Sequence, residues 1–280
     1  MSFLLTLLLL PTCYAQPTLA IPGIIDAHTH TEFDDEPEAM TQIPRTPEEY
    51  RRELREAGAV GAVAHTHIDD EDYHDMRRYN VVHCAGVGPR PHYKDVERGL
   101  RSGKYRCIKI YLGYVHQYAN DAHYEPLYKL AKKFDVPVVF HTGDTYDRRG
   151  LVKYAHPLTI DEVAVDHPEV KFVIAHCGNP WITTAAMVAR KNPNVYLDGS
   201  ALLTGDMDDQ RPERVEEHLV RPLSWLFGYV NDPRKLLFGS DWPLNDIASY
   251  ARAFSRAIPR EHRQAVFHDN AVAVFHLNRR

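Results

Sequence analysis

The chain has 280 residues, a formal net charge of −5 and 44% hydrophobic residues. This length is normal for a closed α/β barrel, which typically needs about 250 residues, and it allows one large core to be buried. The sequence lacks the basic excess of a nucleic-acid-binding protein, so we expect no nucleic-acid partner.

The first fifteen residues, MSFLLTLLLLPTCYA, have the pattern of a signal peptide. A short apolar run from Leu4 to Leu10 is followed by Cys13-Tyr14-Ala15, which suits a cleavage site. The run is too short for a transmembrane helix, so we expect no membrane span. A misassigned start codon or a buried N-terminal extension are the alternatives, because no Lys or Arg precedes the apolar run. Cleavage would make the protein periplasmic or secreted, and otherwise it would be cytoplasmic.

Beyond residue 20, short apolar runs typical of buried parallel strands alternate with amphipathic stretches. The runs cover residues 24–27, 59–64, 81–86, 107–112, 136–140, 171–175, 195–198 and 236–239. Eight strand–helix units favour a single (β/α)8 TIM barrel over an open sheet. Where an open sheet would carry a glycine-rich phosphate loop, this chain has Asp26-Ala27-His28-Thr29-His30. We therefore predict an α/β fold with one domain over residues 16–280.

Helix signals lie between these runs. Thr46 is a candidate N-cap before Pro47 and two glutamates. Residues 121–134 space their apolar side chains at helical intervals, another helix begins at 159–164, and 261–275 is expected to close the barrel. Two polar loops, 31–45 and 202–214, follow strands 1 and 7 and are candidate lids over the catalytic face.

The first strand ends in a His-x-His pair, His28 and His30. Residues at i and i+2 of a strand point to the same side, so both imidazoles are expected to face the mouth of the barrel. An isolated pair of this kind is more often two surface histidines. Three later strands also end in ligand-type residues, however, and the C-terminal ends of all barrel strands converge on one face. We therefore predict that His28 and His30 are metal ligands, whereas Asp26 is a supporting polar residue.

His141 follows the fifth strand and Asp241 follows the eighth. Three imidazoles and one carboxylate make a ligand set for zinc or a similar divalent ion, with Mn²⁺ as the alternative. A carboxylate at such an ion can also accept a proton, so we give Asp241 a catalytic role as well. The alternative for Asp241 is a helix N-cap after strand 8, and for His141 a structural hydrogen bond.

His176 follows the sixth strand, and Lys109 lies in the fourth. His176 is predicted to transfer protons, since an imidazole titrates near working pH, or to bind a second metal ion. Lys109 shares a strand face with Cys107 and Tyr111. If that face points inward, Lys109 could bridge two metals after carboxylation or neutralise an acidic substrate; pairing with a buried carboxylate is the plainer interpretation.

Other polar residues are candidate substrate contacts. A second His-x-His pair, His65 and His67, ends strand 2, and we predict substrate contact through His67 rather than metal binding. Tyr111 and Arg148 are further candidates. The loop arginines that could hold a carboxylate are Arg45, Arg90, Arg148 and Arg149.

The cysteines give little sign of disulfides. Cys84 and Cys107 follow strand patterns and are predicted to be buried small hydrophobic residues. Cys177 follows His176 and should point away from the site by strand alternation.

The motifs IDAHTH, PVVFHTGD, FVIAHCGNPW, VYLDGS, LLFGSDWPL and FHDNAVAVFHL span about residues 23–277 and resemble the amidohydrolase superfamily. The branch most similar contains aminocarboxymuconate-semialdehyde-type decarboxylases and several lactone hydrolases. The resemblance implies one zinc-like ion on His28, His30, His141 and Asp241. It also implies that His176 is catalytic in a mononuclear site, although other branches bind two metals through this position.

Three functions follow as hypotheses. The first is a metal-dependent hydrolase acting on a C–O or C–N bond of a lactone, ester or amide. The second is a metal-dependent, non-oxidative decarboxylase of a small aromatic or unsaturated acid, and release of carbon dioxide would distinguish it. The third is a non-catalytic, metal-stabilised barrel that binds a ligand. Each implies a small-molecule partner, and a homo-oligomer is compatible with all three.

Overall fold

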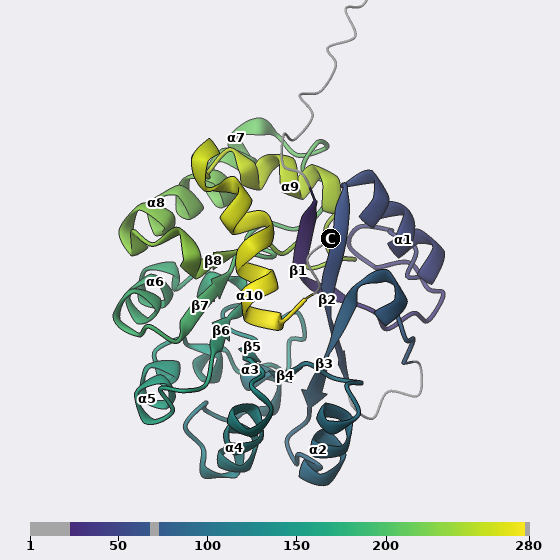
Figure 1. Ribbon diagram of the computed structural model, residues 1–280. Coiled ribbons are helices and arrows are strands. Elements are labelled where there is room, and N and C mark those ends of the chain that lie inside the picture. Colours follow the sequence, from purple (N-terminus) through teal and green to yellow (C-terminus); the bar gives the residue numbers. More distant parts are fainter. Residues whose placement is uncertain (1–22, 68–72, 278–280) are drawn as a thin grey trace, which may run out of the picture.

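The computed structural model describes residues 23–67 and 73–277, in which eight strands form one parallel sheet in chain order (Figure 1). The predicted signal peptide lies outside the described residues. The strands are β1 (Ile24–His30), β2 (Ala59–His67), β3 (Val81–Val87), β4 (Cys107–Ile110), β5 (Val138–Phe140), β6 (Phe172–Ile174), β7 (Val195–Asp198) and β8 (Leu236–Leu237).

Backbone hydrogen bonds join the last strand segment to the first. The amide of Ala27 donates to the carbonyl of Phe238 over 2.8 Å, and the amide of Asp241 donates to the carbonyl of His28 over 2.8 Å. The amide of His30 donates to Trp242 over 2.9 Å. The sheet thus closes into a TIM barrel, as the sequence predicts. One of the hydrogen bonds that close it is donated by the amide of Asp241.

Helices surround the sheet and alternate with its strands. They are α1 (Pro47–Glu56), α2 (Tyr93–Arg101), α3 (Leu112–Val115), α4 (Glu125–Phe134), α5 (Thr159–Asp166), α6 (Ile182–Lys191), α7 (Pro212–Val215), α8 (Arg221–Val230), α9 (Ile247–Ser255) and α10 (Asn270–Phe275). In Figure 1 the yellow α10 lies in front of the strands, and its Phe275 packs with residues inside the barrel. Over 23–67 and 73–277, no helix has the length and apolar character needed to cross a membrane.

The predicted elements are close to the observed ones. Thr46 caps α1, since its hydroxyl accepts a hydrogen bond from the amide of Glu49 over 3.1 Å. The predicted helix 121–134 begins with a 3-10 turn before α4, and 261–275 is divided between 3-10, π and α turns. The predicted strand 107–112 is shorter, because the chain turns into α3 at Leu112.

Side chains of the strands alternate between two apolar layers. On β4, Ile108 and Ile110 pack in the outer layer beneath the helices. Cys107 packs inside the barrel with residues such as Val63 and Leu237. This alternation directs Lys109 into the barrel, where it is fully buried.

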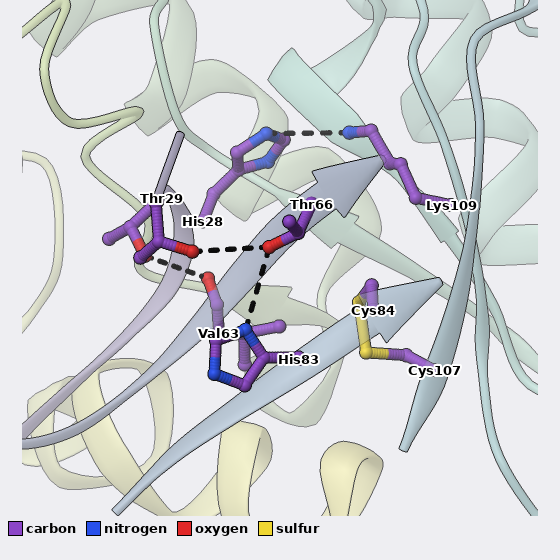
Figure 2. Close-up of a disulfide and its surroundings, with 9 residues drawn as sticks. His28, Thr29, Val63, Thr66, His83, Cys84, Cys107 and Lys109 are labelled. Carbon is purple, nitrogen blue, oxygen red and sulfur yellow. Dashed lines mark hydrogen bonds between the residues drawn. A yellow bond between two sulfur atoms is a disulfide. The ribbon is translucent and has the colours of Figure 1, made fainter. Parts of the chain in front are cut away.

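The prediction that Cys84 and Cys107 are unlinked hydrophobic residues is wrong. They form a disulfide between neighbouring strands β3 and β4, where they are register partners with Cα atoms 4.3 Å apart (Figure 2). Both are fully buried inside the barrel. A sequence separation of 23 hides the pairing in the sequence, because only the strand register brings the two side chains together. Cys177 is a free, buried thiol.

Glu53 on α1 gives a testable pH dependence. Its side chain is 2% exposed and accepts a hydrogen bond from the amide of Ile247. Burial raises the pKa of Glu53 to about 7, against which the Ile247 bond acts. Because the pKa of Glu53 is raised on folding, its protonated side chain contributes fully to the free energy of unfolding below about pH 4.5. This contribution is lost as the pH rises through 7.

We therefore expect Glu53→Gln to raise the free energy of unfolding at pH 8 by about 1–3 kcal/mol. The same substitution should have little effect at pH 4.5, where the wild-type side chain is already protonated. Urea unfolding at both pH values measures the difference. Glu56→Gln, an exposed position on the same helix, is the control. Equal effects of Glu53→Gln at the two pH values would contradict the prediction.

Candidate metal and catalytic site

His28, His30 and Asp241 converge at the C-terminal mouth of the barrel. The Nε2 atoms of His28 and His30 lie 3.3 and 3.1 Å from the same oxygen, Oδ1 of Asp241. His28 is fully buried, whereas the His30 side chain is 28% exposed and also faces Glu32. Burial lowers the pKa of His30, but the hydrogen bonds with Asp241 and Glu32 outweigh it and raise the pKa to about 10. The two ends of the chain thus supply one polar cluster.

Asp241 is held in an unusual backbone conformation. Its φ of 68° lies in the left-handed region, which non-glycine residues adopt rarely and often at functional sites. The hydrogen bond from the backbone amide of Asp241 to the carbonyl of His28 holds this conformation. Burial raises the pKa of Asp241, but its interactions with His176, its hydrogen bond with His30 and the charges of His30 and Lys109 hold the pKa well below its usual range. The carboxylate is therefore ionised at neutral pH.

His141 and His176 face each other across the site, with Nδ1 of His141 3.1 Å from Nε2 of His176. The other nitrogen of His141 bonds the carbonyl of Asp144 over 2.8 Å, which assigns its proton to Nε2. Nδ1 of His176 lies 3.0 Å from Oγ of Ser200, whose hydroxyl donates to Asp198, so His176 carries its proton on Nδ1. Nδ1 of His141 and Nε2 of His176, which face each other, are therefore both unprotonated and present lone pairs.

Asp198 is a site residue that the strand-by-strand analysis missed. Its Oδ2 hydrogen-bonds Nδ1 of His28, and its Oδ1 accepts from the amide of Ser200 over 2.9 Å. Gly239, two residues after the end of β8, leaves room for it, since a Cβ there would stand 2.5 Å from Asp198 Oδ1. The signal was present as a carboxylate that ends strand 7, the rule that identified Asp241. Asp198 fixes the ring of His28 and, through Ser200, that of His176.

Lys109 reaches the site from β4. Its Nζ lies 3.3 Å from Nε2 of His28, an approach that Figure 2 shows beside the disulfide. Burial lowers the pKa of Lys109 to about 8, with Asp198 and Asp241 acting in the opposite direction. The two carboxylates therefore favour the charged form of Lys109.

His28, His176 and Asp241 form a buried group that could hold a metal ion, with ligand-type atoms all within 4.8 Å of one another. Two of the four predicted ligands belong to it, together with His176, which we expected to be catalytic. The donor chemistry fits a divalent ion. Burial lowers the pKa values of His28, His141 and His176, so their imidazoles are neutral, and Asp241 is ionised. The facing lone pairs of His141 and His176 would be stabilised by a cation.

A cavity of about 940 Å³ opens above this group and is lined by His30, His141, His176 and Asp241. Its volume suits a small organic molecule. The predicted contact residues His67 and Tyr111 both line it, with their rings stacked at 4.8 Å. Residues of the predicted lid loops also line it, among them Glu38 and Thr204.

Of the four loop arginines that were candidates for binding a carboxylate, only Arg45 is among the described residues that line the cavity. Arg148 is exposed and is not among the described residues that line the cavity, nor are Arg90 and Arg149. Arg45 lines it, but its guanidinium is bound to Asp34 at 2.6 Å. The structure thus brings the predicted histidines and Asp241 together, and it leaves Arg148 outside.

A comparison with known protein families shows to which family this chain is related. The family described as Amidohydrolase matches residues 25–277, which include every site residue named above. The chain belongs to this amidohydrolase family. No curated protein sequence matches it. Membership places the chain in a family of enzymes without naming its substrate.

Solved amidohydrolase-like structures share the barrel. An amidohydrolase from Burkholderia multivorans with bound zinc is 17% identical, with a TM-score of 0.66, and covers 91% of this chain and 100% of that chain. A probable 2-pyrone-4,6-dicarboxylic acid hydrolase from Acinetobacter baumannii is 15% identical, with a TM-score of 0.63 and coverage of 91% and 99%. The 5-carboxyvanillate decarboxylase from Sphingomonas paucimobilis is 13% identical, with a TM-score of 0.60 and coverage of 92% and 100%. At these identities the likeness shows a common fold.

Proposed function

We propose that this amidohydrolase-family protein is a metal-dependent hydrolase that cleaves a C–O or C–N bond of a small lactone, ester or amide. The observation that carries the proposal is the convergence of His28, His30 and Asp241 beneath the cavity, with Asp241 ionised. The carboxylate of Asp241 and the neutral imidazoles of His141 and His176 line an organic-sized cavity, which suits the activation of water against a carbonyl group.

In this proposal His28, His30, His141 and Asp241 hold one divalent ion, zinc or manganese. When bound, the ion supplies Lewis acidity, which polarises a carbonyl group and makes water more acidic. His30 must give up its proton to become a ligand, so ion binding should release protons from the protein. The zinc in the Burkholderia multivorans structure supports the choice of metal.

His176 and Asp241 carry the proton transfers. Asp241 accepts a proton from the attacking water on its carboxylate, because it is ionised and lines the cavity. Nε2 of His176, which carries a lone pair and faces His141, then takes up this proton from Asp241 and passes it to the leaving group. Its ring orientation comes from the hydrogen bond between Nδ1 and Ser200, which Asp198 holds in turn.

The decarboxylase is the alternative, supported by its occurrence in a protein of the same fold. A decarboxylase must hold an acid substrate, and a cationic side chain is the usual means. Among the described residues that line the cavity, Arg45 is the one arginine or lysine, and Asp34 already neutralises it. This charge balance favours a hydrolase.

The test is elemental analysis of protein purified without added metal, combined with assays of lactone hydrolysis and carbon dioxide release. We expect about one zinc or manganese per chain, retained in His176→Ala and lost in His141→Ala. Turnover by His176→Ala should fall roughly 100- to 10,000-fold, the usual contribution of a proton-transfer group. His218→Ala, an exposed histidine, is the control.

Other outcomes of these measurements would support a different metal site or a different function. Loss of the ion from His176→Ala would make His176 a ligand in the compact group with His28 and Asp241. Two ions per chain would indicate a binuclear site, with Lys109 as a bridging candidate. Carbon dioxide release without hydrolysis would establish the decarboxylase, and ligand binding without turnover would establish the binding protein.

A further inference from the structure

The cavity above the candidate site is rich in carboxylates. Glu32, Glu38, Asp144 and Asp241 all line it, whereas Arg45 is the one arginine or lysine among the described residues of its wall. Because Arg45 is bound to Asp34, its charge does not offset these acids. His30 pairs with Glu32 and Asp241, so Glu38 and Asp144 are the wall carboxylates whose charge is left to act on a substrate. A carboxylate-bearing substrate would be repelled in this cavity, and a cation would be attracted.

Glu38 is the carboxylate best placed to bind a cation. Its side chain is 9% exposed, and within the described residues no basic group lies in ion-pair distance. Oε1 accepts hydrogen bonds from the hydroxyl of Tyr146 over 3.1 Å and from the amide of Met40 over 3.3 Å. A buried carboxylate normally has a cationic partner, so Glu38 is poised for one that the substrate would bring.

The aromatic wall gives a second, independent indication of a ligand. Tyr111 is 9% exposed, and its hydroxyl has no hydrogen-bond partner among the described residues. This buried donor lines the cavity, where a substrate oxygen could satisfy it. Tyr114 and Tyr146 line the same cavity, and aromatic faces attract organic cations.

We propose that the substrate is a cationic ester, lactone or amide, whose positive group binds at Glu38 beside Tyr146 and whose polar end hydrogen-bonds Tyr111. This inference rests on the proposed hydrolase function and names its substrate class. It separates this chain from hydrolases of dicarboxylic acids, because Glu38 would repel a negatively charged substrate.

The test compares substrates that differ in charge alone. Acetylcholine and 3,3-dimethylbutyl acetate have nearly the same shape, because a quaternary nitrogen in the first is a carbon atom in the second. The acetate ester of 4-hydroxybutanoate supplies a negative charge. With the metal-loaded protein we expect kcat/KM to be about tenfold higher for the cationic ester than for the neutral one, and lowest for the anion.

Glu38→Gln should bring the ratio between cationic and neutral esters close to one. Glu36→Gln, an exposed position on the same loop, removes the same charge and should leave the ratio unchanged. If Glu38→Gln fails to fold, Tyr146→Phe offers a second measurement. It removes the hydroxyl bound to Glu38 but keeps the carboxylate, so a preference for the cation should remain.

Binding is measured separately by calorimetry, with choline and the uncharged 3,3-dimethylbutan-1-ol as probes. We expect choline to bind about tenfold more tightly, and Glu38→Gln to abolish the difference. Glu38-dependent choline binding without hydrolysis of any ester would overturn the hydrolase proposal for esters and leave the charge preference standing. Hydrolysis without a charge preference, or with a preference for the anion, would overturn the present inference alone.

Discussion

Asp241→Asn is expected to lower kcat about 1,000-fold, within the usual contribution of a general base. Asparagine keeps the shape of the side chain, but its amide cannot accept the proton from the attacking water. It is also a weaker ligand, so the metal content should fall as well. The decisive measurement is kcat at saturating added metal, which separates the loss of the base from the loss of the ion.

Asp35→Asn is the matched control for this experiment. Asp35 is exposed and, like Asp241, has a positive φ, of 62°, which asparagine tolerates. We expect wild-type kcat from this variant. If metal-saturated Asp241→Asn kept more than about a tenth of the wild-type kcat, Asp241 would not be the base.

Removal of the Cys84–Cys107 disulfide is expected to lower the free energy of unfolding by about 3 kcal/mol. The disulfide joins cysteines that are 23 positions apart in the sequence, so it restricts the unfolded chain, and both cysteines also pack in the barrel interior. Cys84→Ala combined with Cys107→Ala, unfolded in urea without reductant and at fixed metal concentration, measures this loss. Thiol titration of the denatured wild type should show that Cys84 and Cys107 react only after reduction.

Cys177→Ala is the control, because Cys177 is equally buried but unlinked. It removes one packed sulfur and should cost about 1 kcal/mol. A double variant no less stable than Cys177→Ala would mean that the disulfide contributes nothing. Disulfides persist mainly in oxidising compartments, the environment to which the predicted signal peptide would direct the chain.

Much of the architecture could be predicted because it depends on local sequence. A buried parallel strand must be apolar on both faces, so runs such as 138–140 stand out between amphipathic helices. Eight repeats of this pattern leave few topologies, and a closed barrel brings all strand ends to one face. That rule alone placed His28, His141 and Asp241 near one another, although more than 200 residues separate the first from the last.

Contacts between specific side chains could not be predicted from the sequence. Cys84 meets Cys107 only through the register of β3 on β4, and strand propensity does not fix that register. The pairing of Arg45 with Asp34 depends on how one loop folds back on itself. Asp198 carried the signal of a strand-end carboxylate, but its bond to His28, 170 residues away in the sequence, depends on how the closed barrel brings β7 and β1 together.

The sequence by itself determined the barrel, the histidines and the carboxylate at its mouth, because hydrophobic periodicity and parallel connections act locally and repeat eight times. Tertiary structure decided the protonation and orientation of the imidazoles and the charge of the cavity. Those properties depend on burial and on partners from distant strands. Glu38 and Tyr111 acquire their proposed role in this way, since only the folded chain excludes water and other partners from them.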